Sequence, residues 1–402
     1  MEQLFVFILN MPGWLRITLL LLLILMNYGA AFLVKRSILI VYRRTGSAVE
    51  AMNKWRIYKQ YFLTTLQFIT VILSGFLGGV YFIPFEKTGR IIFMLLVLFF
   101  FFIIINVGQL LILDKTYKRI RGTTESLSSQ IRDIAFAFLF ALVPLGVVRT
   151  ISLFIRGINI RSGVLRDIIA AAIPIITAFL YIFIFQALYR GLLKAVDLQD
   201  ERLRELLNGL FDRAGIKKAK LYQWPTRQKK VANALVLGLA NPKVFISDYY
   251  LENAEPDEIE AIVAHEVGHL KQKHILKRLL YIVAGMYGVL IIGNLMEWYE
   301  NYTGNEINLY LGLAILLIPF VLYFSVGFLQ FCRYQERKAD EFALTIGIKP
   351  EVMITALLKV ARLNHMALKQ KKLDEKFQLH PSMARRIGRI EKISGYKYNL
   401  RS

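Results

Sequence analysis

Long runs of apolar residues, separated by shorter polar stretches, are the dominant pattern along the chain. Seven runs have about the length of 20 residues that an α-helix needs to cross the hydrocarbon core of a bilayer. They are Ile17–Val34, Tyr61–Phe85, Ile91–Leu113, Ile134–Ile155, Ile168–Tyr189, Leu279–Met296 and Ile307–Phe331. Arg149, inside the fourth run, either reaches the membrane interface or faces a wet interior. The pattern predicts a mainly α, polytopic membrane protein with about seven transmembrane helices.

The polar connections between these runs alternate in their content of basic residues. Those after the first and third runs are rich in Lys and Arg, those after the second and fourth are poorer, and residues 297–306 contain neither. Cytoplasmic connections of membrane proteins carry the excess of basic residues. The alternation therefore predicts that the N-terminus lies outside and that the polar segments around the last two runs lie on the cytoplasmic side.

Those polar segments carry shorter patterns of their own. Five apolar residues recur at helical spacing before Gly215, which we expect to end the helix: Leu203, Leu206, Leu207, Leu210 and Phe211. Two segments, "KVANALVLGL" and "KVFISDYYL", have the β-branched or alternating character of strands and are separated by Asn241 and Pro242. We therefore expect a small β-sheet beside helices in the polar part of the chain.

Composition supports a membrane protein and weakens one alternative. The chain is 56% hydrophobic and has a formal net charge of +22. Such a charge could serve nucleic-acid binding, but the basic residues cluster beside apolar runs, as expected for connections that face anionic lipid headgroups. We expect the lipid bilayer as a partner and no nucleic acid. Cys332 is the only cysteine, so an intrachain disulfide is impossible.

The segment "HEVGH", residues 265 to 269, carries the strongest chemical signal. It follows Pro256 and two acidic residues, which suit a helix start. On a helix, His265 and His269 point from the same face, the spacing with which two imidazoles bind one Zn²⁺. Glu266 between them is placed to take a proton from water at the metal. A chance pairing is the alternative, but the chain has only five histidines. His274 lies five residues further on, so a continuous helix places it on another face, as an interfacial residue.

A catalytic zinc needs a third protein ligand and one open position. The candidates are carboxylates or His380. Glu336 and Asp340 follow the last apolar run at a spacing of four residues, so Glu336 would complete the site and Asp340 would hydrogen-bond a ligating imidazole. The spacing alone fits a solvated helix face equally well.

Taken in order, HEVGH, two apolar runs, Glu336 with Asp340, and "HPSMARRI" resemble the integral-membrane zinc metalloproteases that include the type I CAAX prenyl proteases and the HtpX heat-shock proteases. Five runs before the motif and two after it are closer to the CAAX branch. The resemblance implies that Asn233 and Ala234 hold substrate backbone, and that His380 acts at the transition-state oxygen with support from Arg386. Ser382 replaces a proline that is common in the family.

The predicted organisation joins a membrane region to a divided protease domain. Residues 1–190 form the five-span region, 191–278 and 332–402 form the two parts of a cytoplasmic zincin-like domain, and 279–331 form a membrane hairpin between them. The function expected is an integral-membrane zinc metalloendopeptidase, with one zinc per chain, that cuts membrane-tethered or lipid-modified (CAAX-type) peptides or proteins. It would lie in the inner membrane of a cell, or in an ER-type membrane of a eukaryote.

Two alternatives remain open from the sequence. One is a broad quality-control protease of damaged membrane proteins. The other is a transporter or channel with a structural zinc, which Glu266 argues against, because a structural site needs no base and favours a closed set of ligands.

Overall fold

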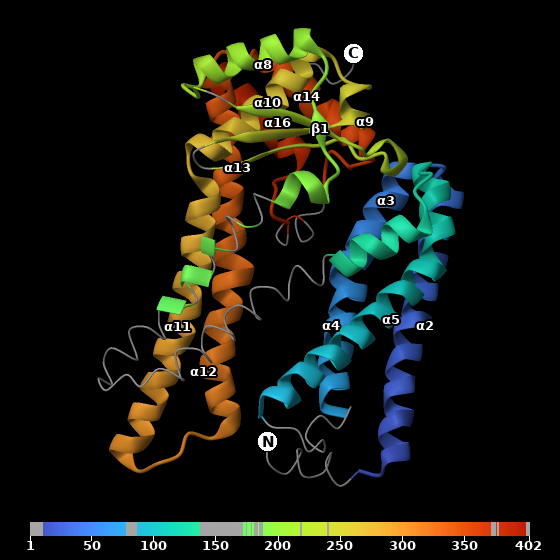
Figure 1. Cartoon of the computed structure of the whole chain (residues 1–402), viewed down its shortest axis with the longest axis vertical. Helices are drawn as coiled ribbons and strands as arrows, with labels where there is room; N and C mark the ends of the chain where they lie inside the picture. Colours follow the sequence, from blue (N-terminus) through green and yellow to red (C-terminus); the bar gives the residue numbers. More distant parts are fainter. Residues whose placement is uncertain are drawn as a thin grey trace. The chain divides into compact units, whose positions relative to one another are not determined.

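The structure is a computed structural model (Figure 1). It describes residues 11–77, 87–136, 172–173, 175–177, 179–180, 184, 188–217, 219–238, 241–370, 375 and 378–398. Two compact units, Met1–Val143 and Pro144–Ser402, are described separately below. Most of the fourth predicted span, including Arg149, and most of the fifth lie outside the described residues.

The first unit is a bundle of long helices. Its elements are α2 (Gly13–Thr45), α3 (Ala48–Ile57), a π-helical turn η1 (Tyr58–Leu63), α4 (Thr64–Leu77) and α5 (Lys87–Arg121). Helices α2 and α5 approach closely where Gly108 faces Tyr28, since a Cβ on Gly108 would lie 2.2 Å from that ring. The Tyr28 hydroxyl donates to the carbonyl oxygen of Ile104 at 2.9 Å. Small residues and buried hydrogen bonds of this kind hold helices together in lipid, where apolar packing alone gives little preference.

The second unit contains a helical hairpin that interrupts its polar part. Helix α11 spans His274–Thr303 and α12 spans Leu309–Leu322, followed by a π-helical turn η4 (Tyr323–Phe328) and by α13 (Leu329–Thr345). The two arms are joined by Tyr281 and Tyr323, whose hydroxyls donate to each other's backbone carbonyl oxygens at 3.3 and 2.7 Å. The hairpin thus ties the start of α11 to the segment that leads into α13.

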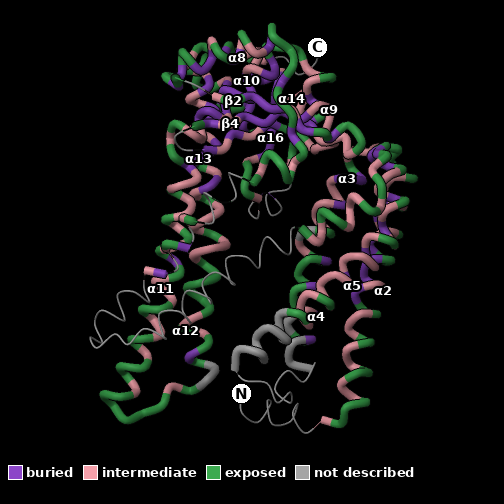
Figure 2. Tube along the Cα trace, in the orientation of Figure 1, coloured by how far each residue is buried: buried purple, intermediate pink, exposed green. Residues whose placement is uncertain are grey.

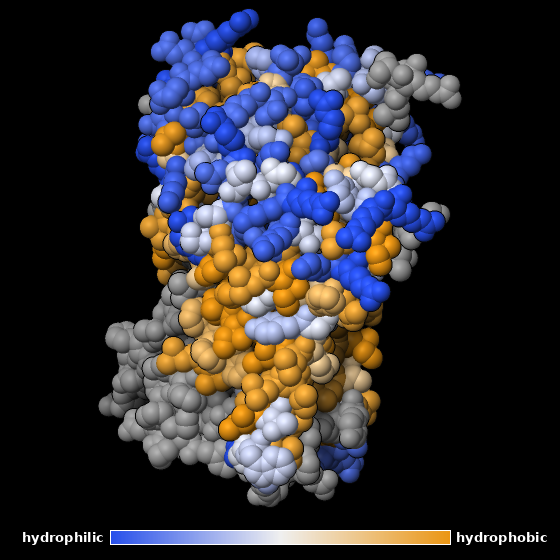
Figure 3. Space-filling view, turned by 90° about the vertical axis from the view of Figure 1, so that its right-hand side faces the viewer, coloured by the Kyte–Doolittle hydropathy of each residue, from blue (hydrophilic) through white to orange (hydrophobic). Residues whose placement is uncertain are grey.

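Among the described residues, four helices are long and apolar enough to cross a membrane: Gly13–Thr45, Leu96–Arg121, His274–Thr303 and Leu311–Thr345. Figure 3 shows hydrophobic side chains gathered in continuous areas of the surface, apart from areas of hydrophilic side chains. The predicted first and sixth spans lie within these helices, and the predicted third and seventh spans overlap the second and fourth of them. The end of the second predicted span lies outside the described residues, and α4 has 14 residues.

The polar part of the second unit is built on a four-stranded mixed sheet with strand order β1-β2-β4-β3. The strands are β1 (Val196–Asp197), β2 (Lys220–Trp224), β3 (Ala234–Leu237) and β4 (Lys243–Ser247). Strands β3 and β4 form the predicted antiparallel hairpin, whereas β2 runs parallel to β4. Because β3 lies at the end of this order, one of its edges pairs with no strand in the part of the chain that the structure describes.

Helices α8 (Glu201–Arg213), α9 (Asp248–Leu251), α10 (Pro256–Lys271), α14 (Pro350–Leu363) and α16 (Met383–Ser394) complete this part of the unit. The predicted helix before Gly215 is α8, and Gly215 ends it with a φ of +64°. Figure 2 shows that buried residues concentrate in the sheet and in α10, α14 and α16. The largest cluster of buried residues includes Leu207, Leu210 and Ile246, all 0% exposed.

Candidate active site

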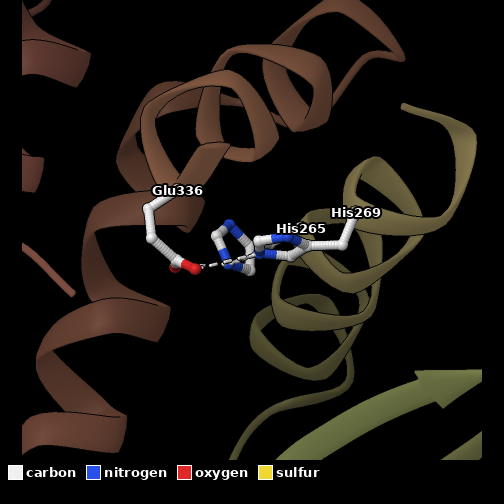
Figure 4. A group of neighbouring side chains, drawn as sticks. All are labelled: His265, His269 and Glu336. Atoms are coloured by element: carbon white, nitrogen blue, oxygen red, sulfur yellow. Dashed lines mark hydrogen bonds and ion pairs between the residues drawn. The ribbon is translucent and has the colours of Figure 1, made fainter. Parts of the chain in front are cut away.

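Helix α10 carries the histidine motif into the core. It begins with Pro256 at its first turn and with a capping box between Glu255 and Glu258, as the sequence pattern predicts for a helix start. His265 and His269 project from the same face, and their Nε2 atoms lie 3.2 Å apart (Figure 4). The helix therefore presents two imidazole nitrogens to one point in space.

Gly268 allows α13 to pack closely against this face. A Cβ on residue 268 would lie only 3.1 Å from the Cα and the carbonyl oxygen of Ala339, which is closer than nearly all real side-chain contacts. Glu336 lies one turn before Ala339 on α13, so this approach brings its carboxylate opposite the two histidines (Figure 4). The His265 Nε2 to Glu336 Oε2 distance is 3.5 Å, and the His269 Nε2 to Glu336 Oε1 distance is 3.4 Å.

These distances fit a metal ion held by His265, His269 and Glu336. Zinc with ligands at its usual bond lengths of 2.0–2.1 Å in tetrahedral geometry separates them by about 3.3 Å, close to the 3.2–3.5 Å found here. Glu336 is 1% exposed, and its Oε2 accepts no hydrogen bond from the described residues. A buried carboxylate oxygen without a donor is costly unless a cation satisfies it. The donor set therefore suits zinc and leaves a fourth position open.

Asp340 and Arg386 support His265 from behind. Asp340 Oδ1 lies 2.8 Å from His265 Nδ1, and Arg386 donates to both oxygens of Asp340, at 2.6 and 2.9 Å. Burial and the charge of Arg386 lower the pKa of His265, but the charge and hydrogen bond of Asp340, with Glu336, outweigh them and raise it to about 9. Because Nδ1 is bonded to Asp340, the lone pair of Nε2 is directed toward the metal position.

His274 contacts the other histidine, contrary to the sequence prediction. It is buried, and its Nδ1 lies 2.8 Å from Nδ1 of His269. The prediction of an interfacial residue on another face was wrong because it assumed one continuous helix. Helix α10 ends at Lys271, Lys273 has a φ of +55°, and α11 starts in a new direction.

Arg278, one turn further along α11, was not singled out from the sequence. Its guanidinium donates to Gln335 Oε1 at 2.6 Å and to Glu336 Oε1 at 3.2 Å. The contact joins residues separated by 58 positions in the chain, and the one local signal in the sequence was a basic residue at the start of an apolar run. Arg278 thus neutralises part of the charge of Glu336 and orients it.

The remaining predicted residues lie around this cluster. Glu266 is half-buried. Burial lowers the pKa of Arg386, but the negative charges of Asp340, Glu336 and Glu266 raise it above its usual range. Nδ1 of His380 lies 2.7 Å from Glu336 Oε2, within ion-pair distance but without hydrogen-bond geometry, and its side chain is 60% exposed.

Asn233 and Ala234 lie at the start of the edge strand β3. The Asn233 backbone N–H donates to Ser247 Oγ at 2.9 Å, and its carbonyl oxygen accepts from Ser247 N–H at 3.0 Å. The Asn233 side chain is exposed and that of Ala234 is buried. Strand β3 also packs against α10, the helix that carries the histidines.

Comparisons with known proteins agree with this geometry. Residues 197–394 match the sequence profile of peptidase family M48. A protease HtpX homolog of Pyrococcus abyssi is 28% identical over 218 residues, which cover 48% of this chain and 73% of that protein. An uncharacterized metalloprotease of Bacillus subtilis, YhfN, is 28% identical over 207 residues, 48% of this chain and 49% of that protein.

The fold is also similar to that of a solved structure. The crystal structure of S. mikatae Ste24p matches with a TM-score of 0.59 at 15% identity, over 95% of this chain and 99% of that one. A helical protein with membrane-length helices and a metal-binding His, His and Glu cluster fits the class of integral-membrane metalloproteases. Residues 197–394 thus match peptidase family M48, and this match confirms the resemblance inferred from the motifs.

Proposed function

We propose that this chain is a zinc endopeptidase that cuts membrane-tethered or lipid-modified proteins near their C-termini, at the cytoplasmic face of the membrane. One zinc per chain is held by His265, His269 and Glu336. The observation that carries the proposal is the spacing of 3.2–3.5 Å among their ligand atoms. Glu266 follows His265 directly in the sequence and is not one of the three ligands. A structural zinc would have no use for that neighbouring base.

Glu266 is the general base of the proposed reaction. When bound, zinc supplies a polarised scissile carbonyl and a water whose pKa is lowered toward about 7. Glu266 then accepts the proton of the attacking water and delivers it to the leaving amine. A carboxylate in this position needs to be half-accessible, as Glu266 is, so that substrate and water can reach it.

His380 and Arg386 complete the proposed site. The exposed ring of His380, with Nδ1 near Glu336, leaves its other nitrogen available to donate to the oxygen that gains negative charge. Arg386 acts indirectly. Its guanidinium donates to both oxygens of Asp340, and Asp340 orients the ring of His265.

The open edge of β3 is the proposed substrate-binding strand. An extended peptide that pairs antiparallel with Asn233 and Ala234 would gain backbone hydrogen bonds with little demand on its sequence. Since β3 packs against α10, a peptide held there passes beside the histidines.

The connection of the site to the membrane favours tethered substrates. Only Gln272 and Lys273 separate α10 from α11. Glu336 lies near the C-terminal end of the membrane-length helical segment Leu311–Thr345. The site therefore lies next to the ends of two membrane helices. We propose seven spans in all, with the N-terminus outside, on the alternation of basic connections in the sequence.

The test compares three substrates of the purified, zinc-loaded chain. We expect kcat/KM to be highest for a farnesylated peptide, lower for the same peptide without the lipid, and lowest for an unfolded soluble protein. Equal values for all three would discard the lipid-tethered substrate and favour general quality control. Absence of cleavage by a preparation with full zinc content would reject the endopeptidase itself.

A further inference from the structure

The metal ligand His269 has a hydrogen-bond partner that lies at the start of a membrane helix. His274 is 2% exposed, and its Nδ1 lies 2.8 Å from Nδ1 of His269. The two rings meet edge to face, with centroids 4.9 Å apart and an interplanar angle of 74°. Among the described residues, no carboxylate contacts Nδ1 of His269 in the way that Asp340 contacts His265, and His274 occupies the equivalent place.

The direction of this hydrogen bond follows from the ligand role of His269. A neutral imidazole has one N–H and one lone pair, and the lone pair of His269 Nε2 faces the metal position. The proton must then be on Nδ1, which donates to Nδ1 of His274. His274 is the acceptor and carries its own proton on Nε2.

The backbone is shaped to make this contact. In an uninterrupted α-helix, residues 269 and 274 would be separated by about 140° around the axis, so their rings could not meet. Lys273 instead adopts a φ of +55°, a left-handed conformation that is unfavourable for a residue with a side chain. This break starts α11 in a direction that returns His274 to His269.

We propose that His274 is a positioning residue for the zinc ligand His269: it accepts the Nδ1 proton and thereby fixes the tautomer and ring orientation that present Nε2 to the metal. The inference rests on the proposed zinc site and extends it to α11. Together with Arg278, which donates to Glu336, His274 makes the first two turns of α11 a support for two of the three ligands.

Two substitutions of similar size separate positioning from simple packing. Asn places its Oδ1 where His274 has Nδ1, so His274→Asn keeps an acceptor, whereas His274→Leu fills the space with a methyl group. Loss of a residue that orients a metal ligand typically weakens metal affinity about 10–100-fold. We expect this loss in the Leu variant and recovery of most of the affinity in the Asn variant, measured by zinc transfer to a competing chelator.

The control is Lys277→Gln, which alters an exposed residue on the same turn of α11 and should leave zinc affinity unchanged. The visible absorption spectrum of the Co²⁺-loaded protein provides a second measurement, and we expect it to change in the Leu variant and to be close to native in the Asn variant. If the Leu variant does not fold, His274→Ser, whose hydroxyl is too short to reach His269, takes its place.

The outcomes distinguish this inference from the proposed function. Native zinc affinity and a native cobalt spectrum in the Leu or Ser variant would overturn the role of His274 while leaving the zinc site intact. Equal weakening in the Asn and Leu variants would assign His274 to packing alone. If the native chain itself binds no zinc, the proposed function fails as well.

Discussion

Both compact units bury polar side chains in helical surroundings, but a buried amide network inside the first contrasts with a buried cluster of charged groups in the second. Within the bundle of α2, α4 and α5, Asn27 donates to Thr70 Oγ1 at 2.7 Å, and Gln109 donates to Asn27 Oδ1 at 3.3 Å. Between α10, α13 and α16, the buried groups are Glu336, Asp340 and Arg386, which carry charge.

The two kinds of buried group have different consequences: neutral groups join helices, whereas charged groups need a cation or several hydrogen-bond donors. A neutral amide is satisfied by one or two hydrogen bonds, and in lipid such bonds join helices. A buried carboxylate remains costly until a cation or several donors compensate it. Asp340 has Arg386 for this purpose, but Oε2 of Glu336 accepts no hydrogen bond from the described residues, although Nδ1 of His380 lies 2.7 Å away. The second unit therefore has an unmet requirement for a cation, and the described residues of the bundle do not present one of that kind.

The largest expected effect is a loss of kcat on substitution of Glu266, the proposed general base next to the charged cluster. Glu266→Gln should retain zinc and fold but lose about 10²–10⁴-fold in kcat, because an amide cannot accept the proton of the attacking water. Steady-state cleavage and metal analysis of the same preparation measure both properties. Glu260→Gln is the matched control, since Glu260 lies on α10 but pairs with Arg213, and it should cleave at the native rate. Near-native turnover of Glu266→Gln would reject the mechanism.

The next effect concerns the support behind His265. Asp340→Asn preserves the shape of the side chain but removes the charge that balances Arg386 and orients His265. We expect zinc affinity to fall by about 10–100-fold, measured by competition with a chelator. Glu341→Gln, which changes the neighbouring carboxylate in its exposed pair with Arg389, should keep the native affinity. An unchanged affinity in Asp340→Asn would show that the aspartate does not act through His265.

The raised pKa of His265 predicts a pH dependence of zinc binding. In the metal-free chain this pKa is about 9, above the usual value of 6.5, so the imidazole is protonated at neutral pH and must lose its proton to bind zinc. Zinc affinity should therefore rise by about tenfold per pH unit as the pH increases toward 9, and then level off. The stability that protonated His265 gives the metal-free fold is complete below pH 6.5 and is lost as the pH rises through 9.

Calorimetry at pH 7.5 in buffers of different ionisation enthalpy measures the protons released when zinc binds. We expect a release that includes the His265 proton and that is smaller in Asp340→Asn. The same release from both proteins would contradict the role assigned to Asp340.

The smallest effect belongs to the neutral network of the bundle. Asn27→Leu should destabilise the first unit by about 0.6–1.7 kcal/mol, seen as a modest fall in thermal stability in detergent, with no change in zinc content. Leu33→Ile, at an exposed position of α2, should have no such effect. Loss of zinc from Asn27→Leu would show that the two kinds of buried polar group are not independent.

Patterns within one element were readable from the sequence, whereas partners from distant segments were not. The spacing of His265 and His269, the helix before Gly215 and the β3–β4 hairpin depend on neighbours within a few residues, and the sequence patterns predicted each of these arrangements. Strands β1 and β2 were not predicted, because β1 has two residues and the pairing of β2 with β4 joins segments separated by about twenty residues.

The contacts of His274 and Arg278 are further examples of features that the sequence pattern did not predict. The break before α11 occurs at Lys273, and neither glycine nor proline marks it in the sequence. The contact of Arg278 with Glu336 requires the whole α11–α12 hairpin to return the chain. Periodicity assigns residues to a helix face, but it does not reveal where one helix stops and the next begins in a new direction.

The central claim is that His265, His269 and Glu336 hold one zinc ion, and metal analysis tests it most directly. The native chain and Glu336→Ala are purified in the same way, their fold is checked by elution profile, and the zinc content per chain is measured. We predict one zinc in the native chain and strongly reduced zinc in the variant. No zinc in the native chain, or full occupancy in Glu336→Ala, would contradict the account.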